Sequence, residues 1–299
     1  MDEIILKVDH LSKTYKSKKR ITKAVDDVSF YLKKGETLAL VGESGCGKTT
    51  TGRMIVGLLK SDAGIIEFKN HQINNLSKSE FRKLRSSIQI IFQDATAVLN
   101  PRMKIRKLLL EAIRANDNKI THENEIVEDI IINVGLSTND LDRYPHEFSG
   151  GQRQRICIAR AIAMKPDLIV CDEPVSALDL LVQQQILILL KDLQKKYNFS
   201  YIFISHNLAV VRYMSDRIAV MCQGKIVEEG TTEEIFLNPS HIYTKILLDS
   251  IPIIGEELKY TGDIYLESDN KYQGVMRDLK NKKFQKKELS DTHYVLADI

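Results

Sequence analysis

One glycine-rich segment has the spacing of residues that bind nucleotide phosphates. It fits G-x-x-x-x-G-K-[ST] and comprises Gly42, Glu43, Ser44, Gly45, Cys46, Gly47, Lys48 and Thr49, with Thr50 directly after it. Backbone N–H groups of such a loop surround the phosphates, which approach closely where glycine has no side chain. We expect this phosphate loop and Thr50 to bind the nucleotide, with Lys48 reaching the β- and γ-phosphates and Thr49 ligating Mg²⁺.

The flanking residues distinguish this segment from a glycine-rich turn that matches by chance. Apolar residues Thr37–Val41 before it predict a buried strand, and residues from Thr49 to about Leu59 predict a helix. A strand followed by the loop and a helix is the context that the pattern requires.

A second segment is also suited to an anion. Ser149, Gly150, Gly151 and Gln152 open a predicted helix that runs to about Met164. Unpaired N–H groups and the positive dipole end make a helix N-terminus a site for phosphate. The sequence therefore presents two phosphate-binding segments in one chain.

Acidic residues end one apolar strand. The run 168–171 leads directly into Asp172 and Glu173. We expect Asp172 to act at the Mg²⁺ site through the water shell of the metal, and Glu173 to be the general base for a water aimed at the γ-phosphate. The alternative is that both acids only cap the next turn.

Two further polar residues follow strands. His206 comes directly after the predicted strand Tyr201–Ser205, and Gln93 comes at the end of the predicted strand Ile88–Phe92. Carboxyl ends of parallel strands meet at one edge of a sheet, so these side chains should lie near the acids. We expect His206 to contact the γ-phosphate and Gln93 to touch Mg²⁺ or the attacking water, although a histidine at a strand end also occurs as a structural residue.

The remaining pattern predicts an α/β protein. Strands are expected at Ile4–Val8, Ala24–Leu32 and Ile65–Phe68, with a basic turn at 16–20 between the first two. Helical spacing replaces strand signals from about Asn100, and a hairpin is expected around residues 223–224. From about residue 256 the sequence is polar, and we expect the lysine clusters at 280–283 and 286–287 to belong to a solvated tail.

Composition narrows the class of protein. Lysine and arginine number 43 against 40 aspartate and glutamate residues, so bulk charge does not indicate nucleic-acid binding. No secretory signal or bilayer-spanning apolar run is seen, so we expect any membrane contact to come through a partner. The four cysteines have no metal-ligand spacing and are expected to be free thiols.

The set of motifs in this order resembles the nucleotide-binding subunit of ABC transporters. It consists of the phosphate loop, Gln93, the 148–152 segment, Asp172 and Glu173, the 176–179 turn and His206. The resemblance implies a P-loop NTPase fold of ABC type, with an antiparallel β subdomain and a helical insertion. It also implies that two subunits sandwich two ATP molecules, each signature segment (149–152) facing the other subunit's phosphate loop.

The same resemblance assigns roles that the residues alone do not. It makes Tyr15 the aromatic residue that stacks on adenine, and it places Asp179 in contact with the opposite subunit's site. Gln93 would link the nucleotide to the helical insertion, which in this family receives the coupling helix of the membrane subunit.

A finer resemblance is to the ATPases of oligopeptide and dipeptide importers, and to the second of their two ATPases. The resemblance to these importers rests on residues 99–103, 144–148, 171–179 and 238–244. The resemblance to the second ATPase rests on residues 151–155, which begin in the signature segment. It implies an ABC ATPase domain over 1–250, a helical subdomain over about 95–163 and a C-terminal extension over 251–299. No cysteine follows Cys222, so no iron–sulfur site is expected in this extension.

The resemblance implies that this chain hydrolyses ATP, with Mg²⁺ as cofactor, and that hydrolysis energises peptide import. It also implies a position at the cytoplasmic face of the cell membrane. The implied partners are a second ATPase subunit in a heterodimer, two transmembrane permeases and an extracytoplasmic substrate-binding protein. Alternatives are the same machine carrying nickel or a metal–chelator complex, a soluble ABC protein acting on DNA or the ribosome, and a P-loop small-molecule kinase. The kinase leaves residues 149–152 unexplained.

Overall fold

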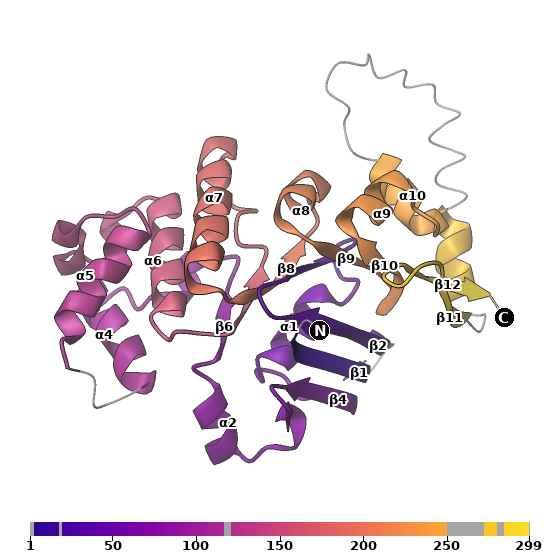
Figure 1. The fold of residues 1–299 in the computed structure, drawn as a ribbon, viewed down its shortest axis with the longest axis horizontal. Coiled ribbons are helices and arrows are strands. Elements are labelled where there is room, and N and C mark those ends of the chain that lie inside the picture. Colours follow the sequence, from indigo (N-terminus) through magenta and orange to yellow (C-terminus); the bar gives the residue numbers. More distant parts are fainter. Residues whose placement is uncertain (1–2, 18–19, 117–120, 250–271, 280–283, 299) are drawn as a thin grey trace.

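The fold is built on two β-sheets (Figure 1). The structure is a computed structural model, and it describes residues 3–17, 20–116, 121–249, 272–279 and 284–298. A four-stranded antiparallel sheet has the order β2-β1-β4-β5. Its strands are β1 (Ile4–Ser17), β2 (Arg20–Lys33), β4 (Ala63–Phe68) and β5 (His71–Gln72).

The larger sheet has eight strands in the order β11-β12-β10-β9-β3-β8-β7-β6. The strands from β9 to β6 are parallel, and β10, β12 and β11 continue the sheet in antiparallel pairs. The parallel strands are β3 (Thr37–Val41), β6 (Ile88–Ile91), β7 (Leu168–Asp172), β8 (Ser200–Ser205) and β9 (Arg217–Cys222). The other three are β10 (Lys225–Thr231), β11 (Phe284–Glu288) and β12 (Tyr294–Asp298).

Alternate residues of the central strands belong to different hydrophobic cores. Leu168 and Val170 of β7 pack with the antiparallel sheet and α1 (Lys48–Ile55), whereas Ile169 and Cys171 pack with helices on the opposite face. Both faces of these strands are covered, which explains why their sequences are apolar runs and not alternating patterns. The central sheet is therefore a rigid, fully buried support for whatever follows its strand ends.

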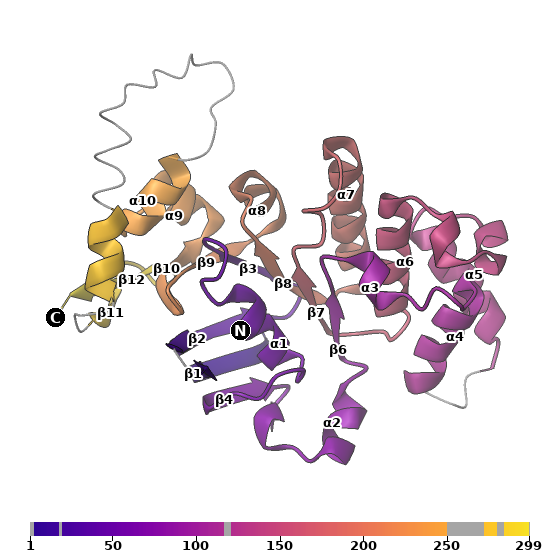
Figure 2. The same cartoon turned by 180° about the vertical axis from the view of Figure 1, so that it is seen from behind.

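Helices α1 and α2 (Lys78–Leu84) pack with the core of the antiparallel sheet, and the others form a group beside the sheet edge at β6 and a smaller group beside β9 and β10 (Figures 1 and 2). The two groups comprise α3 (Ala95–Val98), α4 (Ile105–Asn116), α5 (Glu123–Asn133), α6 (Gly150–Ile162), α7 (Leu180–Tyr197), α8 (Leu208–Met214), α9 (Thr232–Leu237) and α10 (Ile242–Asp249). A further helix covers residues 272–279. Within the described residues, no helix is long and apolar enough to cross a bilayer.

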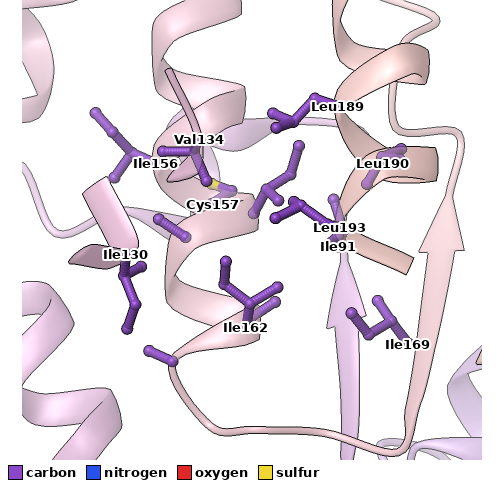
Figure 3. Close-up of a cluster of buried hydrophobic side chains, with 14 of the residues drawn as sticks. Ile91, Ile130, Val134, Ile156, Cys157, Ile162, Ile169, Leu189, Leu190 and Leu193 are labelled. Carbon is purple, nitrogen blue, oxygen red and sulfur yellow. The ribbon is translucent and has the colours of Figure 1, made fainter. Parts of the chain in front are cut away.

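One continuous core joins the helical group to the sheet. Ile91 of β6 lies among Cys157 and Ile162 of α6 and Leu190 and Leu193 of α7 (Figure 3). The fold class expected from the sequence is confirmed: a mixed α/β cassette with an antiparallel sheet and inserted helices.

The basic segment at 16–20 lies where β1 passes into β2, as the sequence predicts: Lys16 and Ser17 end β1 and pair with Ile21 and Arg20 of β2. One local prediction was wrong, because helix α1 ends at Ile55, four residues before the expected Leu59. Gly57 follows it with a positive φ of 67°, a conformation that ends helices readily.

The prediction of a solvated tail was also wrong where the structure describes it. Lys286 and Lys287 lie in β11, which pairs with β12, and β12 pairs with β10. Lysines on an edge strand keep further strands from pairing with it, so their charge is compatible with a strand there. The cluster at 280–283 lies outside the described residues.

The turn between β11 and β12 is fastened to α9 by one carboxylate. Glu234 accepts hydrogen bonds from Ser290 Oγ (2.7 Å), Thr292 Oγ1 (2.9 Å) and Thr231 N–H (2.8 Å). Burial opposes its charge, but these hydrogen bonds outweigh burial and lower the pKa of Glu234 from 4.5 to about 2. The ionised carboxylate therefore stabilises the docked hairpin.

We predict that Glu234→Gln lowers the free energy of unfolding near pH 7 by on the order of 1 kcal/mol, the size of one hydrogen-bonded group. Because the folded-state pKa is depressed, the difference from the parent should be complete above pH about 4.5 and shrink as the pH falls towards about 2. Denaturant titrations over this range check it. The exposed neighbour is the control, since Glu233→Gln should show no such pH dependence, and a pH-independent difference for Glu234→Gln would contradict the assignment.

Candidate functional site

The phosphate loop follows the central strand β3 and leads into α1. Gly42 and Gly47 have φ angles of 144° and 112°. A Cβ atom at Gly42 would lie 2.1 Å from the carbonyl oxygen of Met221, and one at Gly47 would lie 2.1 Å from that of Ala24. Only glycine fits both positions, which places the loop backbone directly on β9 and β2. By contrast, Gly45 (φ 82°) would carry its Cβ in open space.

Lys48 lies folded inside the loop. Its ammonium group donates to the carbonyl oxygens of Gly42 (2.6 Å) and Glu43 (2.8 Å), and its side chain is buried. The Cys46 sulfur lies 3.7 Å away, and burial raises the pKa of this thiol, so it is a neutral neighbour. These hydrogen-bond partners are uncharged, so an anionic phosphate group would supply a counter-charge to the ammonium group.

Thr49 joins the loop to β7. Its hydroxyl donates to Asp172 Oδ1 at 2.7 Å. Burial raises the pKa of Asp172, the nearby Glu173 adds to this effect, and the Thr49 hydrogen bond opposes it. A hydroxyl and a buried carboxylate that lacks a full counter-charge are the oxygen ligands that Mg²⁺ takes beside phosphate oxygens, so the donor set fits this ion. Thr50, the next residue, is half-buried on α1.

Glu173 is held from two sides. Its N–H donates to the carbonyl oxygen of Ile204 on β8 (3.0 Å), and its φ is 52°, in the left-handed region that non-glycine residues rarely occupy. His206 Nδ1 lies 3.0 Å from Glu173 Oε1. An ionised carboxylate only accepts, so Nδ1 is then the donor, and Nε2 is left to face other groups. Such a constrained backbone conformation is common at functional sites.

The parallel register brings these groups together. β3 pairs with β8, β8 with β7 and β7 with β6, so the loop, His206, the acids and Gln93 follow neighbouring strand ends. A cavity of about 360 Å³ opens there. Its lining comprises Gly42, Glu43, Ser44, Glu173, His206, Leu208 and Leu247.

Gln93 lies at the end of this row. It is exposed and comes two residues after the end of β6, because this strand ends at Ile91 and not at Phe92 as the sequence predicts. The adjoining Phe92 lines another cavity, of about 370 Å³, between β6 and the helical group. The Phe92 carbonyl accepts from Gln154 of α6 (3.4 Å). Gln93 thus stands where the strand edge meets the helices.

The signature segment lies elsewhere. Ser149 caps α6, because Gln152 N–H donates to Ser149 Oγ (3.3 Å) and Ser149 N–H donates to Gln152 Oε1 (3.0 Å). Ser149 and Gly150 are exposed. Helix α6 lies beyond α7 as seen from α1 (Figures 1 and 2), and no hydrogen bond among the described residues joins this segment to the phosphate loop.

Gly151 has a structural role that sequence reasoning missed. A Cβ atom there would lie 2.4 Å from Val182 Cγ1, so the glycine allows α6 to pack closely against α7. Asp179 caps α7 by accepting from Val182 N–H (3.1 Å) and is itself exposed. The signature segment and Asp179 thus lie at the N-terminal ends of two helices that pack against each other.

Tyr15 is 46% exposed on β1, where it pairs with Thr22. No hydrogen bond or ring contact in the described structure ties it to the phosphate loop. Its adenine-stacking role stays a prediction.

Two residues of α10 reach the site from the C-terminal side. Glu43 N–H donates to Tyr243 Oη (3.1 Å), and Leu247 lines the cavity beside Glu173. Tyr243 lies in the 238–244 segment that carries the finer resemblance, but the sequence predicts no contact with the loop for either residue, because a tyrosine and a leucine on an amphipathic helix are typical core residues.

Two family models match the chain. "ABC transporter" matches residues 25–176, and "Oligopeptide/dipeptide transporter, C-terminal region" matches residues 227–273. Solved cassettes share the fold. The ATP-binding cassette MJ0796, in a dimeric post-hydrolysis state bound to ADP and Pi, is 28% identical with a TM-score of 0.69, and the match covers 76% of this chain and 99% of that one. Likewise, cbiO1 from Clostridium perfringens is 29% identical with a TM-score of 0.70, covering 79% and 92%.

Curated relatives are more similar. The oligopeptide transport ATP-binding protein AppF of Bacillus subtilis is 52% identical over 233 residues, which are 77% of this chain and 71% of AppF. OppF of Streptococcus mutans is 42% identical over 299 residues (98% and 94%), and the dipeptide transport ATP-binding protein DppF of Lactococcus lactis is 48% identical over 254 residues (83% and 81%). The chain belongs to the ABC transporter family, among the oligopeptide and dipeptide transport ATP-binding proteins.

Proposed function

We propose that this chain is the ATP-hydrolysing subunit that energises an ABC importer of oligopeptides or dipeptides, held at the cytoplasmic face of the cell membrane by permease subunits. The observation that carries the ATPase role is the convergence of Lys48, the Thr49–Asp172 pair and the Glu173–His206 pair at one sheet edge. The peptide cargo is supported by similarity to peptide transport ATPases and by the match to their C-terminal region.

The loop and the strand-end residues divide the work of hydrolysis. Lys48 would leave the carbonyl oxygens of Gly42 and Glu43 to neutralise the β- and γ-phosphates. Thr49 and Asp172, with Gln93, would hold Mg²⁺, which when bound neutralises charge on the phosphate oxygens.

The Gln93→Ala substitution tests the proposed role of Gln93: transport should fall while ATP binding is retained.

Glu173 has the position of a general base. Its carboxylate would take the proton of a water aimed at the γ-phosphate, and His206 Nδ1, 3.0 Å from Oε1, would hold that carboxylate in place. Nε2 of His206, turned away from Glu173, is then available to the γ-phosphate.

We predict that Glu173→Gln lowers the ATP turnover of the assembled complex by about 10²-fold or more, because the amide cannot accept the proton. ATP affinity should be unchanged, since Gln keeps the size and the hydrogen bond of the side chain. Steady-state hydrolysis and equilibrium ATP titration measure the two quantities. Glu233→Gln on α9 should turn over like the parent, and Lys48→Ala should instead weaken binding. Unchanged turnover in Glu173→Gln would remove this residue from the base role.

The signature segment completes the proposal for assembly. Ser149 and the 150–151 backbone are built as a capped helix start, separate from the loop that holds Lys48. We propose that they face the nucleotide of a second, non-identical ATPase subunit, with Asp179 beside them, while Tyr15 stacks on this chain's own adenine. Tyr15→Ala should accordingly weaken ATP binding by the isolated chain.

We predict that Ser149→Arg leaves the ATP affinity of the isolated chain unchanged and abolishes most hydrolysis in the assembled complex. Ser137→Arg is the matched control, because Ser137 is also exposed and caps a short helix of the same helical group. Both changes cost about 1 kcal/mol of capping. Only Ser149→Arg should impair turnover. Loss of ATP binding by the isolated Ser149→Arg chain would contradict the proposed role in the partner's site.

Growth tests the cargo. A strain lacking this chain should fail to grow when peptides are the only source of a required amino acid, and the free amino acid should restore growth. The parent chain should complement the strain, and the Glu173→Gln variant should not. Unimpaired growth on peptides together with loss of nickel uptake would favour the alternative cargo. Co-purification with ribosomes or DNA in place of permeases would oppose a transport role.

A further inference from the structure

The phosphate loop contains an acid at a position where a negative charge is unfavourable. Glu43 is the only acidic residue of segment 42–49, and it lines the cavity together with Glu173. A carboxylate that turned into this cavity would repel a nucleotide triphosphate, since like charges close together are costly. Something must therefore determine where the Glu43 side chain points.

Four hydrogen bonds hold Glu43. Its N–H donates to Tyr243 Oη (3.1 Å), and its carbonyl oxygen accepts from Lys48 Nζ (2.8 Å) and from the Cys46 N–H (3.3 Å). Its carboxylate Oε2 accepts a hydrogen bond from Tyr272 Oη. The rings of Tyr243 and Tyr272 lie 6.4 Å apart, so both hydroxyls approach the loop from the same side.

Tyr272 belongs to the 272–279 helix, which packs on the core beside α10 (Figures 1 and 2). Met276 Sδ lies 2.8 Å from Gln223 Nε2, and Leu279 is buried. The neighbouring Gly224 N–H donates to the carbonyl oxygen of Cys46 (2.9 Å). The helix thus touches both the loop and the turn that supports the loop.

The segment that carries this helix is anchored beyond it as well. His293 Nε2 lies 2.7 Å from Glu228 Oε1, Glu234 binds Ser290 and Thr292, and β12 pairs with β10. The hairpin that follows the 272–279 helix is therefore held to β10 and α9 by contacts that do not involve the phosphate loop.

We propose that Tyr272 is a positioning residue for ATP binding: it holds the Glu43 carboxylate against the C-terminal helix, so that the loop presents its N–H groups and Lys48 to the phosphates. This inference rests on the proposed function, because it assigns to the C-terminal segment a part in the affinity of the same site. Without the Tyr272 hydroxyl, the carboxylate is free to turn towards the phosphates.

The test measures ATP binding by the full, isolated chain through equilibrium titration. Tyr272→Phe should weaken binding about tenfold or more, in keeping with the loss of one hydrogen bond to a charged group. Glu43→Gln removes the charge that Tyr272 holds, so Tyr272→Phe added to Glu43→Gln should change the affinity by less than about twofold relative to Glu43→Gln alone, as a double-mutant cycle requires for residues acting through each other.

A matched control separates this role from general damage to the C-terminal segment. Tyr294 lies on β12, and its hydroxyl donates to the Asp291 carbonyl oxygen (3.3 Å), away from the loop. Tyr294→Phe should bind ATP like the parent. The factor by which Tyr272→Phe weakens ATP binding should also become smaller at high salt, because the Debye length falls from about 10 Å at 0.1 M to about 3 Å at 1 M.

Three results would overturn the inference: parent-like binding by Tyr272→Phe, an equal loss with and without Glu43→Gln, or an affinity ratio that salt does not change. Lys48→Ala, measured in parallel, separates this from failure of the proposed function. If Lys48→Ala binds ATP like the parent, the ATP site itself is misassigned. If Lys48→Ala loses binding and Tyr272→Phe does not, only the role of Tyr272 fails. Thermal unfolding of each variant identifies any that is misfolded, and Tyr272→Leu, whose side chain has no hydrogen-bond donor, then replaces Tyr272→Phe.

Discussion

The hydrogen bond from Thr49 to Asp172 is the contact on which the rest of the site depends. It spans 2.7 Å between the start of α1 and the end of β7, two elements more than 100 residues apart in sequence. The contact exists only because β8 lies between β3 and β7 in register with both. A shift of one residue in either pairing would separate the hydroxyl from the carboxylate and exchange the side chains that the two buried faces of the strand present to their cores.

That register is protected by packing on two sides. Leu38 and Leu40 of β3 contact the core shared with the antiparallel sheet, and Ala39 and Val41 contact the core under α8. A strand buried on both faces cannot slide without exposing apolar area, which costs about 25 cal/mol per Å². Hydrophobic burial on both faces of β3 therefore maintains the register on which the Thr49–Asp172 hydrogen bond depends.

The sequence predicts those parts of the site that follow local rules. The phosphate loop, the acids after β7 and His206 after β8 were found because apolar runs of the right length precede them. The order of strands in the sheet was not available from that pattern, since short buried strands look alike in sequence. Gly151 shows a second limit of prediction from sequence. Its close approach to Val182 is a tertiary contact between two helices, and no local pattern predicts such a contact.

The prediction for the C-terminal segment was wrong for a different reason. Mixed charge at 284–288 resembles a solvated tail, yet an edge strand has one side in water and accepts charged residues there. Tyr272 was overlooked because its partner lies 229 positions earlier in sequence. Contacts of such separation arise from the fold as a whole.

The pairing of β10 with β12 has a consequence for how the protein is made. β10 ends at Thr231, and β12 begins at Tyr294. During synthesis the ribosome must add the residues between them before the outer edge of β10 finds its partner. Until then that edge carries unpaired N–H and C=O groups, which can pair with another nascent chain. Chaperones therefore have an exposed strand edge to protect during the time between synthesis of β10 and synthesis of β12.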